Sequence, residues 1–283
     1  MKLSEIFDPI NSDLLLVQAE LGKVTSELED MPAKIVFDHY FKIPGKLLRP
    51  SLLLLSAAAA DIDECNSVKQ KLIKAAAAIE LIHNASLIHD DIVDHEMLRR
   101  GQKTLNNVYG NKIAVMAGNA LFSRAITTIL GEVSKEAALK ITLMVKKMSS
   151  VEVQQLDKVS DSGSREDYIK LIEGKTALLM SNSCMLGAGI VTMDNVKISA
   201  LQQFGLNFGM AYQIVDDIID QDPLAIRHVT MEDAKEYSRK AILQLYNFNE
   251  SSYRAALVQM LEYILSLTHI KAETEVKSEK NIM

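Results

Sequence analysis

Residues 85–109 read ASLIHDDIVDHEMLRRGQKTLNNVY and place three aspartates inside an apolar helical pattern. The pattern runs from about residue 67 to residue 97, with apolar residues recurring at threes and fours. Asp90, Asp91 and Asp94 occupy positions i, i+1 and i+4, which share one edge of a helix. Helices ordinarily carry carboxylates on their solvated face or in their first turn. The pattern therefore predicts that the three carboxylates converge on one side for a chemical reason.

The same spacing recurs in YQIVDDIID (212–220), at Asp216, Asp217 and Asp220. Carboxylates this close raise one another's pKa unless a cation neutralises them. Oxygen ligands select hard metal ions, and Mg²⁺ is usually held by a few carboxylates together with phosphate oxygens. A single triplet is explained equally well by a solvated acidic face. Two triplets with one spacing, both in apolar helices, favour a magnesium site.

Basic residues near these motifs have side chains of the kind that hold phosphate oxygens. They are Arg99 and Arg100 after the first triplet, Lys46 and Arg49 in GKLLRP (45–50), and Lys175 with Thr176 in LIEGKTALL (171–179). Each alone is explained by a surface ion pair or by a stem packed on apolar surface. Together with the triplets they predict a diphosphate pocket. His83, without zinc-type spacing to other ligands, is by default a core histidine.

The whole chain favours an all-α fold. Its 283 residues are 48% hydrophobic, enough for a sizeable core. No proline lies between Pro50 and Pro223, which favours long helices, and strand patterns are hard to find. Helices are expected to begin near residues 13 and 33 and at 45–50, and to cover about 67–97, 113–131, 134–158, 165–193, 195–221, 231–245 and 250–268. Without repeats or linkers, we expect one all-α domain over residues 1–270 and a charged, fraying tail over 271–283.

Charge and hydropathy limit the partners. A net charge of −6 disfavours the broad basic surface that nucleic-acid binding needs. The N-terminus is acidic where a signal peptide would be apolar, and the longest apolar run, Leu52 to Ala60, is shorter than a membrane span. We expect a cytoplasmic protein, and transient membrane-surface contact during product release stays open.

The motifs resemble those of the trans-isoprenyl diphosphate synthases, the polyprenyl synthetase family. The resemblance covers about residues 40–222 and is weaker over the last helices. It rests on GKLLRP, ELIHNASLIHDDIVD followed by RRGQKTLN, EGKTALL and FGMAYQIVDDIID, in the family's order. The resemblance implies a large helical bundle with a central cavity. It also implies Mg²⁺-dependent, head-to-tail condensation of isopentenyl diphosphate with an allylic diphosphate, in a homodimer.

The resemblance also assigns roles by position. It implies that Mg²⁺, roughly three ions per active site with substrate bound, is held by Asp90, Asp91, Asp94, Asp216, Asp217 and Asp220. Arg99 would contact the allylic diphosphate, whereas isopentenyl diphosphate would be held by Arg100, Lys46, Arg49 and His83. Lys175, Thr176 and Gln213 would line the space where a carbocation forms.

Chain length depends on the positions four and five residues before the first triplet, where bulky aromatic residues stop growth early in the family. Here they are the small Ser86 and Ala85, which implies a tunnel open at its top and a medium-length or long all-trans product. Growth would continue past Ile82, Leu81 and Ala78. We expect Phe122 and Ile126 to form the floor, although ordinary core packing explains both equally well.

One departure from the family keeps alternatives open. The segment QDPLAIRHVTMEDAKEY (221–237) passes almost directly to the terminal helices, where the family has a lysine-bearing loop and a further helix. Arg227 or His228 would have to substitute for that lysine. The alternatives are a short-chain synthase, making geranylgeranyl or farnesyl diphosphate, and a non-catalytic subunit of a heteromeric synthase. A terpene cyclase is disfavoured because cyclases usually replace the second triplet.

Overall fold

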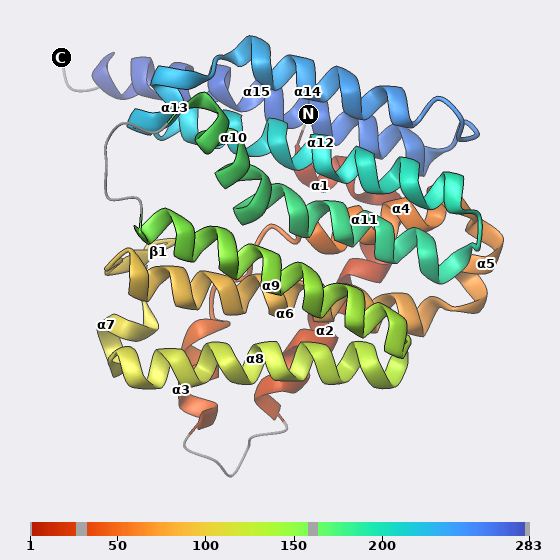
Figure 1. Ribbon diagram of the computed structural model, residues 1–283, viewed down its shortest axis with the longest axis horizontal. Helices are drawn as coiled ribbons and strands as arrows, with labels where there is room; N and C mark the ends of the chain where they lie inside the picture. The colour runs from red at the N-terminus through yellow and green to blue at the C-terminus, as the bar shows by residue number, and fades with distance from the viewer. Residues whose placement is uncertain (1, 27–32, 158–163, 281–283) are drawn as a thin grey trace.

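The computed structural model describes residues 2–26, 33–157 and 164–280, and these ranges are almost entirely helical (Figure 1). The first half contains α1 (Leu3–Ile6), the short 3₁₀ helix η1 (Asp8–Ile10), α2 (Asn11–Ser26), α3 (Ala33–Tyr40), α4 (Leu48–Ala60), α5 (Ile62–Ser67), α6 (Lys69–Val93), β1 (Leu98–Arg99), β2 (Gln102–Lys103), α7 (Leu105–Tyr109) and α8 (Asn111–Glu132). The second half contains α9 (Lys135–Asp157), α10 (Arg165–Ile172), the π-helical turn η2 (Glu173–Ala177), α11 (Leu178–Val191), α12 (Asn195–Ile219), α13 (Pro223–His228), α14 (Met231–Gln244) and α15 (Ser252–Lys280). The all-α prediction is confirmed.

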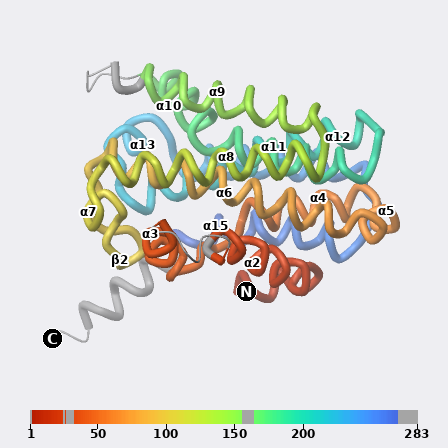
Figure 2. The backbone as a smooth tube through the Cα atoms, turned by 90° about the horizontal axis from the view of Figure 1, so that it is seen from below, coloured from red at the N-terminus to blue at the C-terminus, as the bar shows by residue number. Residues whose placement is uncertain are grey.

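The long helices α6, α8, α9, α11 and α12 run roughly along one axis of the molecule (Figures 1 and 2). Helix α6 packs along α8, and α12 packs between α11 and α14. Local sequence fixes where some of them begin. The Asp194 side chain accepts hydrogen bonds from the backbone N–H groups of Val196 and Lys197 and so caps α12. Ser164 and Asp167 form a capping box at the start of α10.

A close backbone approach holds α11 against α4. A Cβ atom on Gly187 would lie 2.1 Å from the carbonyl oxygen of Leu53, so only glycine permits this contact. The large buried side chains of the surrounding core include Phe204, Phe208, Leu52 and Ile79. This packing makes the bundle a rigid frame for whatever its helix ends carry.

Four local expectations are corrected. Helix α6 ends at Val93, about one turn before the predicted end. A short antiparallel hairpin, β1 with β2, forms where no strand was expected. The helix predicted at 165–193 is interrupted by η2, and α15 continues to Lys280, past the start of the expected tail.

Among the described helices, α8 alone is long and apolar enough to cross a membrane by length and composition. In this fold it packs along α6, α7 and α9. A packed core helix passes the same test, so this is weak evidence for a membrane segment.

Candidate active site

The two aspartate triplets lie at equivalent places in two helices. Helices α6 and α12 are both 25 residues long, and each ends within its triplet, with Asp94 and Asp220 as the capping residues. A non-glycine residue with positive φ follows each cap, His95 at 54° and Gln221 at 57°. The triplets therefore occupy last helical turns. This corrects the position expected for the first triplet inside a helix running to about residue 97, whereas the second was expected near the end of a helix at about residue 221.

The same pair of backbone features closes both helices. The N–H of Glu96 donates to the carbonyl of Asp91 at 2.9 Å, and the N–H of Asp222 donates to that of Asp217 at 2.9 Å. This is the Schellman type of helix end. Because a helix C-terminus carries partial negative charge, carboxylates placed there are unfavourable without a cation. Both ends are thus suited to binding a positive ion.

Two carboxylates of the first triplet, those of Asp90 and Asp94, share Lys175 as a neighbouring charge, whereas Asp91 has a different partner. Asp90 is half-buried and lines a cavity, whereas Asp94 is exposed. Asp91 is buried and pairs with Arg99, whose Nε lies 2.6 Å from Asp91 Oδ1. Burial raises the pKa of Asp90, opposed by the charge of Lys175, and burial raises the pKa of Asp91, opposed by Arg99. Asp90 and Asp91 therefore have different surroundings.

In the second triplet, Asp217 is held at both oxygens. The amide Nε2 of Gln213 donates to Oδ1 at 2.7 Å, and the Tyr168 hydroxyl donates to Oδ2 at 2.7 Å. Thr176 in turn donates from Oγ1 to Oε1 of Gln213 at 2.6 Å. Burial raises the pKa of Asp217, opposed by these hydrogen bonds from Tyr168 and Gln213. Thr176 and Gln213, two of the three residues predicted to line the reaction space, are therefore joined by hydrogen bonds to the second triplet.

The π-helical turn η2 connects the two triplets. It carries Lys175 and Thr176 side by side, and π turns often mark functional positions. Burial alone would lower the pKa of Lys175, but the charges of Asp90, Glu152 and Asp94 raise it overall. Lys175 therefore faces the first triplet while Thr176 contacts the second through Gln213.

The carboxylates at the site fit a magnesium ion whose coordination is completed by oxygen atoms of a bound ligand. Among the described residues, no three His, Cys, Asp or Glu side chains lie close enough to form a metal cage by themselves. Two acidic helix ends with desolvated carboxylates still need positive charge. Mg²⁺ is commonly bound by one or two carboxylates with phosphate oxygens and water. Metal binding by the six aspartates stays a prediction.

A buried charged cluster lies beside the triplets. Arg49 is buried in the first turn of α4, and its Nε has no hydrogen-bond partner among the described residues. Burial lowers the pKa of Arg49, which the nearby charge of Glu80 opposes. Burial and then the charge of Arg49 lower the pKa of His83 well below its usual value, so His83 is neutral at pH 7. An unsatisfied buried donor next to cations indicates a site for an anion.

Glu80 is the acidic member of this cluster, and sequence analysis missed it. Burial raises its pKa, opposed by Arg49 and then Arg100. A Cβ atom on Gly45 would lie 3.2 Å from both Arg100 Nη2 and Glu80 Oε1, so glycine lets the chain pass close to this pair. Lys46 is exposed and precedes α4, so it does not share the buried position of Arg49.

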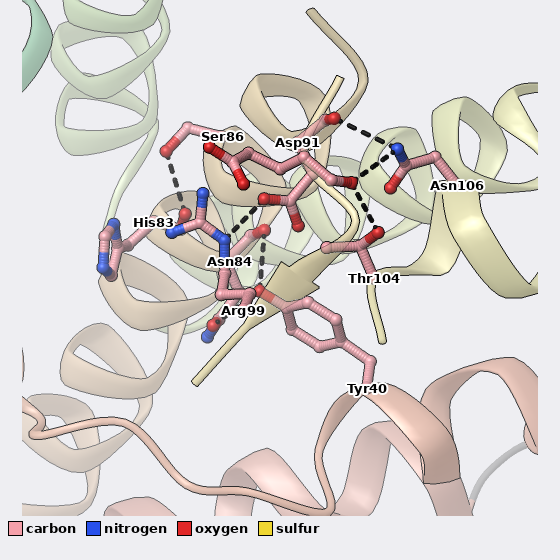
Figure 3. A network of polar contacts seen from close by, with 9 residues as sticks. Tyr40, His83, Asn84, Ser86, Asp91, Arg99, Thr104 and Asn106 are labelled. Atoms are coloured by element: carbon pink, nitrogen blue, oxygen red, sulfur yellow. Dashed lines mark hydrogen bonds and ion pairs between the residues drawn. The ribbon is translucent and has the colours of Figure 1, made fainter. Parts of the chain in front are cut away.

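The hairpin after α6 presents Arg99 and Arg100. Arg100 and Gly101 have positive φ values of 53° and 76°, as two-residue hairpin turns commonly require. Thr104 Oγ1 and Asn106 Nδ2 donate to the carbonyl of Glu96, at 2.8 and 3.0 Å, and fasten the base of the hairpin to the end of α6. Figure 3 shows Arg99 reaching Asp91 from this hairpin.

Helix α3 supports the hairpin from its other side. His39 Nε2 lies 2.8 Å from the carbonyl oxygen of Lys103, and Gln102 donates to the carbonyl of His39. The hydroxyl of Tyr40 donates to Oδ1 of Asn84 at 3.1 Å (Figure 3). The positions of the two arginines thus depend on three segments that are distant in sequence.

An apolar cavity of about 410 Å³ extends from Asp90 into the bundle. It is lined by Ile82, Ala85, Ser86, His89, Asp90 and Val93 of α6, Asn119 and Phe122 of α8, Val145, Met148, Ser149, Glu152 and Val153 of α9, and Lys175. The Ser86 hydroxyl donates to the carbonyl of His83 at 2.8 Å and is already satisfied. The cavity wall is therefore suited to a hydrocarbon chain with its anionic end at Asp90.

The predicted chain-length residues have different positions. Ala85, Ser86 and Phe122 line the cavity, but Ile126 does not, and it packs against the core instead. Below Ile82, the residues Ala78 and Ile79 are fully buried. In this conformation the cavity ends at the level of Ile82, and its floor includes Phe122 but not Ile126.

The sequence matches the family described as Polyprenyl synthetase over residues 33–277. A prenyl transferase of Cyanidium caldarium is 32% identical over 238 residues, covering 82% of this chain and 72% of that protein. Heptaprenyl diphosphate synthase component 2 of Geobacillus stearothermophilus is 32% identical over 221 residues, covering 78% of this chain and 67% of that protein.

Solved structures agree in fold. Geranylgeranyl pyrophosphate synthetase from Pyrococcus horikoshii has a TM-score of 0.82 at 24% identity and covers 94% of this chain and 99% of its own. Polyprenyl synthase from Caulobacter crescentus, complexed with calcium and isoprenyl diphosphate, has a TM-score of 0.79 at 24% identity, covering 94% of this chain and 98% of its own. The chain belongs to the polyprenyl synthetase family and is a prenyltransferase. The family condenses prenyl chains from isoprenyl diphosphates and uses a divalent metal ion.

Proposed function

We propose that this protein condenses isopentenyl diphosphate head to tail with an allylic diphosphate, with Mg²⁺ as the metal ion. One observation carries the proposal. Lys175 lines the apolar cavity together with Asp90, and the next residue, Thr176, is linked through Gln213 to Asp217 of the second triplet. Such an arrangement places an anionic headgroup at the mouth and its hydrocarbon chain inside.

Each group has a defined task in this reaction. Asp90, Asp94, Asp216 and Asp217 would hold Mg²⁺, which when bound supplies positive charge to the departing diphosphate. Lys175 lines the cavity beside Asp90, and Arg99 pairs with the neighbouring Asp91; both would stabilise the negative charge that develops as the allylic C–O bond breaks. The electron pair of that bond leaves with the diphosphate.

The second substrate would be bound by basic residues of which Arg49 is buried and Arg100 is exposed. Arg49 and Arg100 would bind isopentenyl diphosphate, while neutral His83 can donate or accept one hydrogen bond. The isopentenyl double bond then attacks the allylic carbon to form the new C–C bond. A proton leaves from the adjacent carbon to the released diphosphate, which restores a double bond. A dry apolar wall protects the cation from water.

The depth of the cavity bears on product length. Asp90 and Ile82 are eight residues apart on α6, about 12 Å along the helix axis. At about one helix turn per five-carbon unit, this depth holds between two and three units. We infer a short product of no more than three units, such as farnesyl diphosphate, for this conformation. The medium or long product expected from the small Ala85 and Ser86 requires the floor residues to move aside.

We also propose that two copies associate through the outer face of α8. Ile113, Met116 and Leu130 are exposed along this helix, at 43%, 66% and 48%. They recur at helical spacing, and Leu139 and Leu143 of neighbouring α9 are exposed as well. Apolar side chains grouped on one face commonly mark an interface. A different partner chain is the second candidate, because one relative is named as a component of a synthase.

Purified protein incubated with isopentenyl diphosphate, an allylic primer and Mg²⁺ tests the function. We expect release of inorganic diphosphate and a prenyl product, identified by chromatography after dephosphorylation. Asp90→Ala should lower turnover by about 10²-fold or more through lost charge stabilisation. If inorganic diphosphate is released only after a partner chain is added, the protein is instead a subunit that depends on that partner for activity. Failure with every allylic primer and partner would refute the proposal.

A further inference from the structure

Tyr168 holds one oxygen of a carboxylate in the second triplet. It lies in α10, is 3% exposed, and donates from its hydroxyl to Asp217 Oδ2 at 2.7 Å. Gln213 occupies the other oxygen, Oδ1. Because each carboxylate oxygen has two acceptor positions, both oxygens keep one free after these bonds. The two donors thus fix the rotation of the carboxylate without using up its capacity.

The position of Tyr168 is itself fixed by packing. Its ring belongs to a small buried cluster, separate from the main core, that includes Ile172, Ile214, Val215 and Ala225. Its members come from α10, η2, α12, α13, α14 and the connection between α13 and α14, so the cluster joins the elements on either side of Asp217. A buried side chain packed against several elements has little freedom to shift.

Further contacts hold α10 in place. Arg165 Nη2 lies 2.5 Å from Asp233 Oδ1 at the start of α14. The capping box of Ser164 and Asp167 fixes the first turn of α10. Burial, followed by the hydrogen bond to Asp217, raises the pKa of Tyr168, so the hydroxyl keeps its proton at neutral pH. Tyr168 is therefore a permanent donor on a fixed element.

We propose that Tyr168 is a positioning residue, which orients the Asp217 carboxylate so that its free lone pairs face the metal-bound diphosphate. This inference rests on the proposed function of the second triplet. Residues that hydrogen-bond to a metal-binding side chain commonly change metal affinity by 10–100-fold when removed. Tyr168 acts through Asp217 and does not contact the reacting carbons.

The test compares two single-oxygen deletions in the full-length protein. Tyr168→Phe removes the donor, whereas Tyr237→Phe removes a hydroxyl from a tyrosine that packs against the same cluster. Binding of Mn²⁺ in the presence of inorganic diphosphate is followed by the electron paramagnetic resonance of the free ion. We expect Tyr168→Phe to weaken Mn²⁺ binding by about tenfold and Tyr237→Phe to leave it unchanged. The Mg²⁺ concentration for half-maximal turnover should shift in parallel.

A second comparison separates positioning from general damage. In an Asp217→Ala background, Tyr168→Phe should have no further effect on Mn²⁺ binding, because Tyr168 acts only through that carboxylate. Incorporation of 4-aminophenylalanine at position 168 should restore a donor and recover part of the affinity. Thermal unfolding reports any loss of folding separately.

The outcomes are distinct. A lower melting temperature for Tyr168→Phe with unchanged Mn²⁺ binding would overturn the inference and leave a purely structural role. An equal loss in the Asp217→Ala background, or no recovery with 4-aminophenylalanine, would also overturn it. If the wild-type protein binds Mn²⁺ with diphosphate but makes no prenyl product, the proposed function fails while the positioning role stands.

Discussion

The Nε atom of Arg99 lies 2.6 Å from Oδ1 of Asp91, so one carboxylate of the first triplet is already paired within the protein. The Asp91 side chain is buried, and Asn106 also donates to its backbone carbonyl at 3.1 Å. Its neighbour Asp90 instead lines the cavity. Adjacent aspartates of one motif therefore have different surroundings: Asp91 pairs with an arginine, and Asp90 faces the cavity.

This difference predicts different kinetic defects. Asp91→Asn removes the charge partner of Arg99, so the KM for the allylic diphosphate should rise by about tenfold, corresponding to one charged hydrogen bond. Its requirement for Mg²⁺ should change little. Asp90→Asn should instead raise the Mg²⁺ requirement and lower kcat. Steady-state kinetics at varied Mg²⁺ check this, and matching Mg²⁺ profiles for the two variants would contradict it.

The local geometry of this motif could not be read from spacing alone. The i, i+1, i+4 pattern correctly places the aspartates on one helix, but the helix ends within the motif and a hairpin folds back over it. Arg99 of that hairpin forms an ion pair with Asp91. A sequence pattern describes periodicity within an element, whereas a helix end depends on a left-handed residue such as His95, which is rare for a non-glycine.

Burial of Asp90 predicts a stability effect in the metal-free protein. Burial raises the pKa of Asp90, opposed by Lys175, so the folded chain binds this proton more tightly than the unfolded chain. The stabilising contribution is therefore present below the unfolded pKa and is lost as pH rises through the folded pKa. At pH 7 the ionised, desolvated carboxylate weakens the fold.

Asp90→Asn should consequently raise the melting temperature of metal-free protein at pH 7, by about 2–4 °C for each kcal/mol relieved. The gain should shrink at pH 4, where the wild-type carboxyl is increasingly protonated. Thermal scans with a chelator at both pH values measure this. Asp94→Asn is the control, because Asp94 is exposed. A lower melting temperature for Asp90→Asn at pH 7 would contradict the argument.

Glu80 provides a prediction about the buried basic cluster. It is 3% exposed and is the acidic group whose charge acts on Arg49. Unlike Asp90, Glu80 acts on a cation that is itself buried, so we expect the attraction lost at Arg49 to outweigh the relief of desolvating Glu80. Glu80→Gln keeps the shape and should cost about 3 kcal/mol of stability. Chemical denaturation measures the loss.

The matched control is Glu132→Gln. Glu132 pairs with Lys74 at 2.6 Å with its side chain 48% exposed, so its loss should cost less than about 1 kcal/mol. Equal effects of the two substitutions would show that Glu80 is not the counter-charge of Arg49. Inorganic diphosphate should stabilise the Glu80→Gln protein at least as much as the wild type, because an anion then faces more net positive charge.

Sequence analysis found the residues that belong to motifs and missed those that reach the site from elsewhere. Tyr168 contacts Asp217 across 49 positions of sequence, and nothing local to Tyr168 signals that contact. Glu80 did have a local signal. It is the one carboxylate in the apolar run AAAAIELIH (75–83), three residues before His83, and a lone carboxylate in such a run is either on a solvated face or buried with a partner. The contact of Tyr168 and the burial of Glu80 both depend on tertiary packing, which sequence periodicity does not describe.

The cavity floor gives the last prediction. Phe122 lines the cavity and Ile126, one helix turn further along α8, does not. Phe122→Ala should therefore deepen the cavity by about the length of an aromatic side chain and shift the products to longer chains, by about one five-carbon unit per helix turn gained. Ile126→Ala and Ile126→Phe should leave chain length unchanged, whereas Ala85→Phe should shorten it. Chromatography of the dephosphorylated products reads out all four variants. If Ile126→Ala lengthened the product and Phe122→Ala left its length unchanged, the cavity floor would lie one helix turn deeper, which would favour the long-chain product.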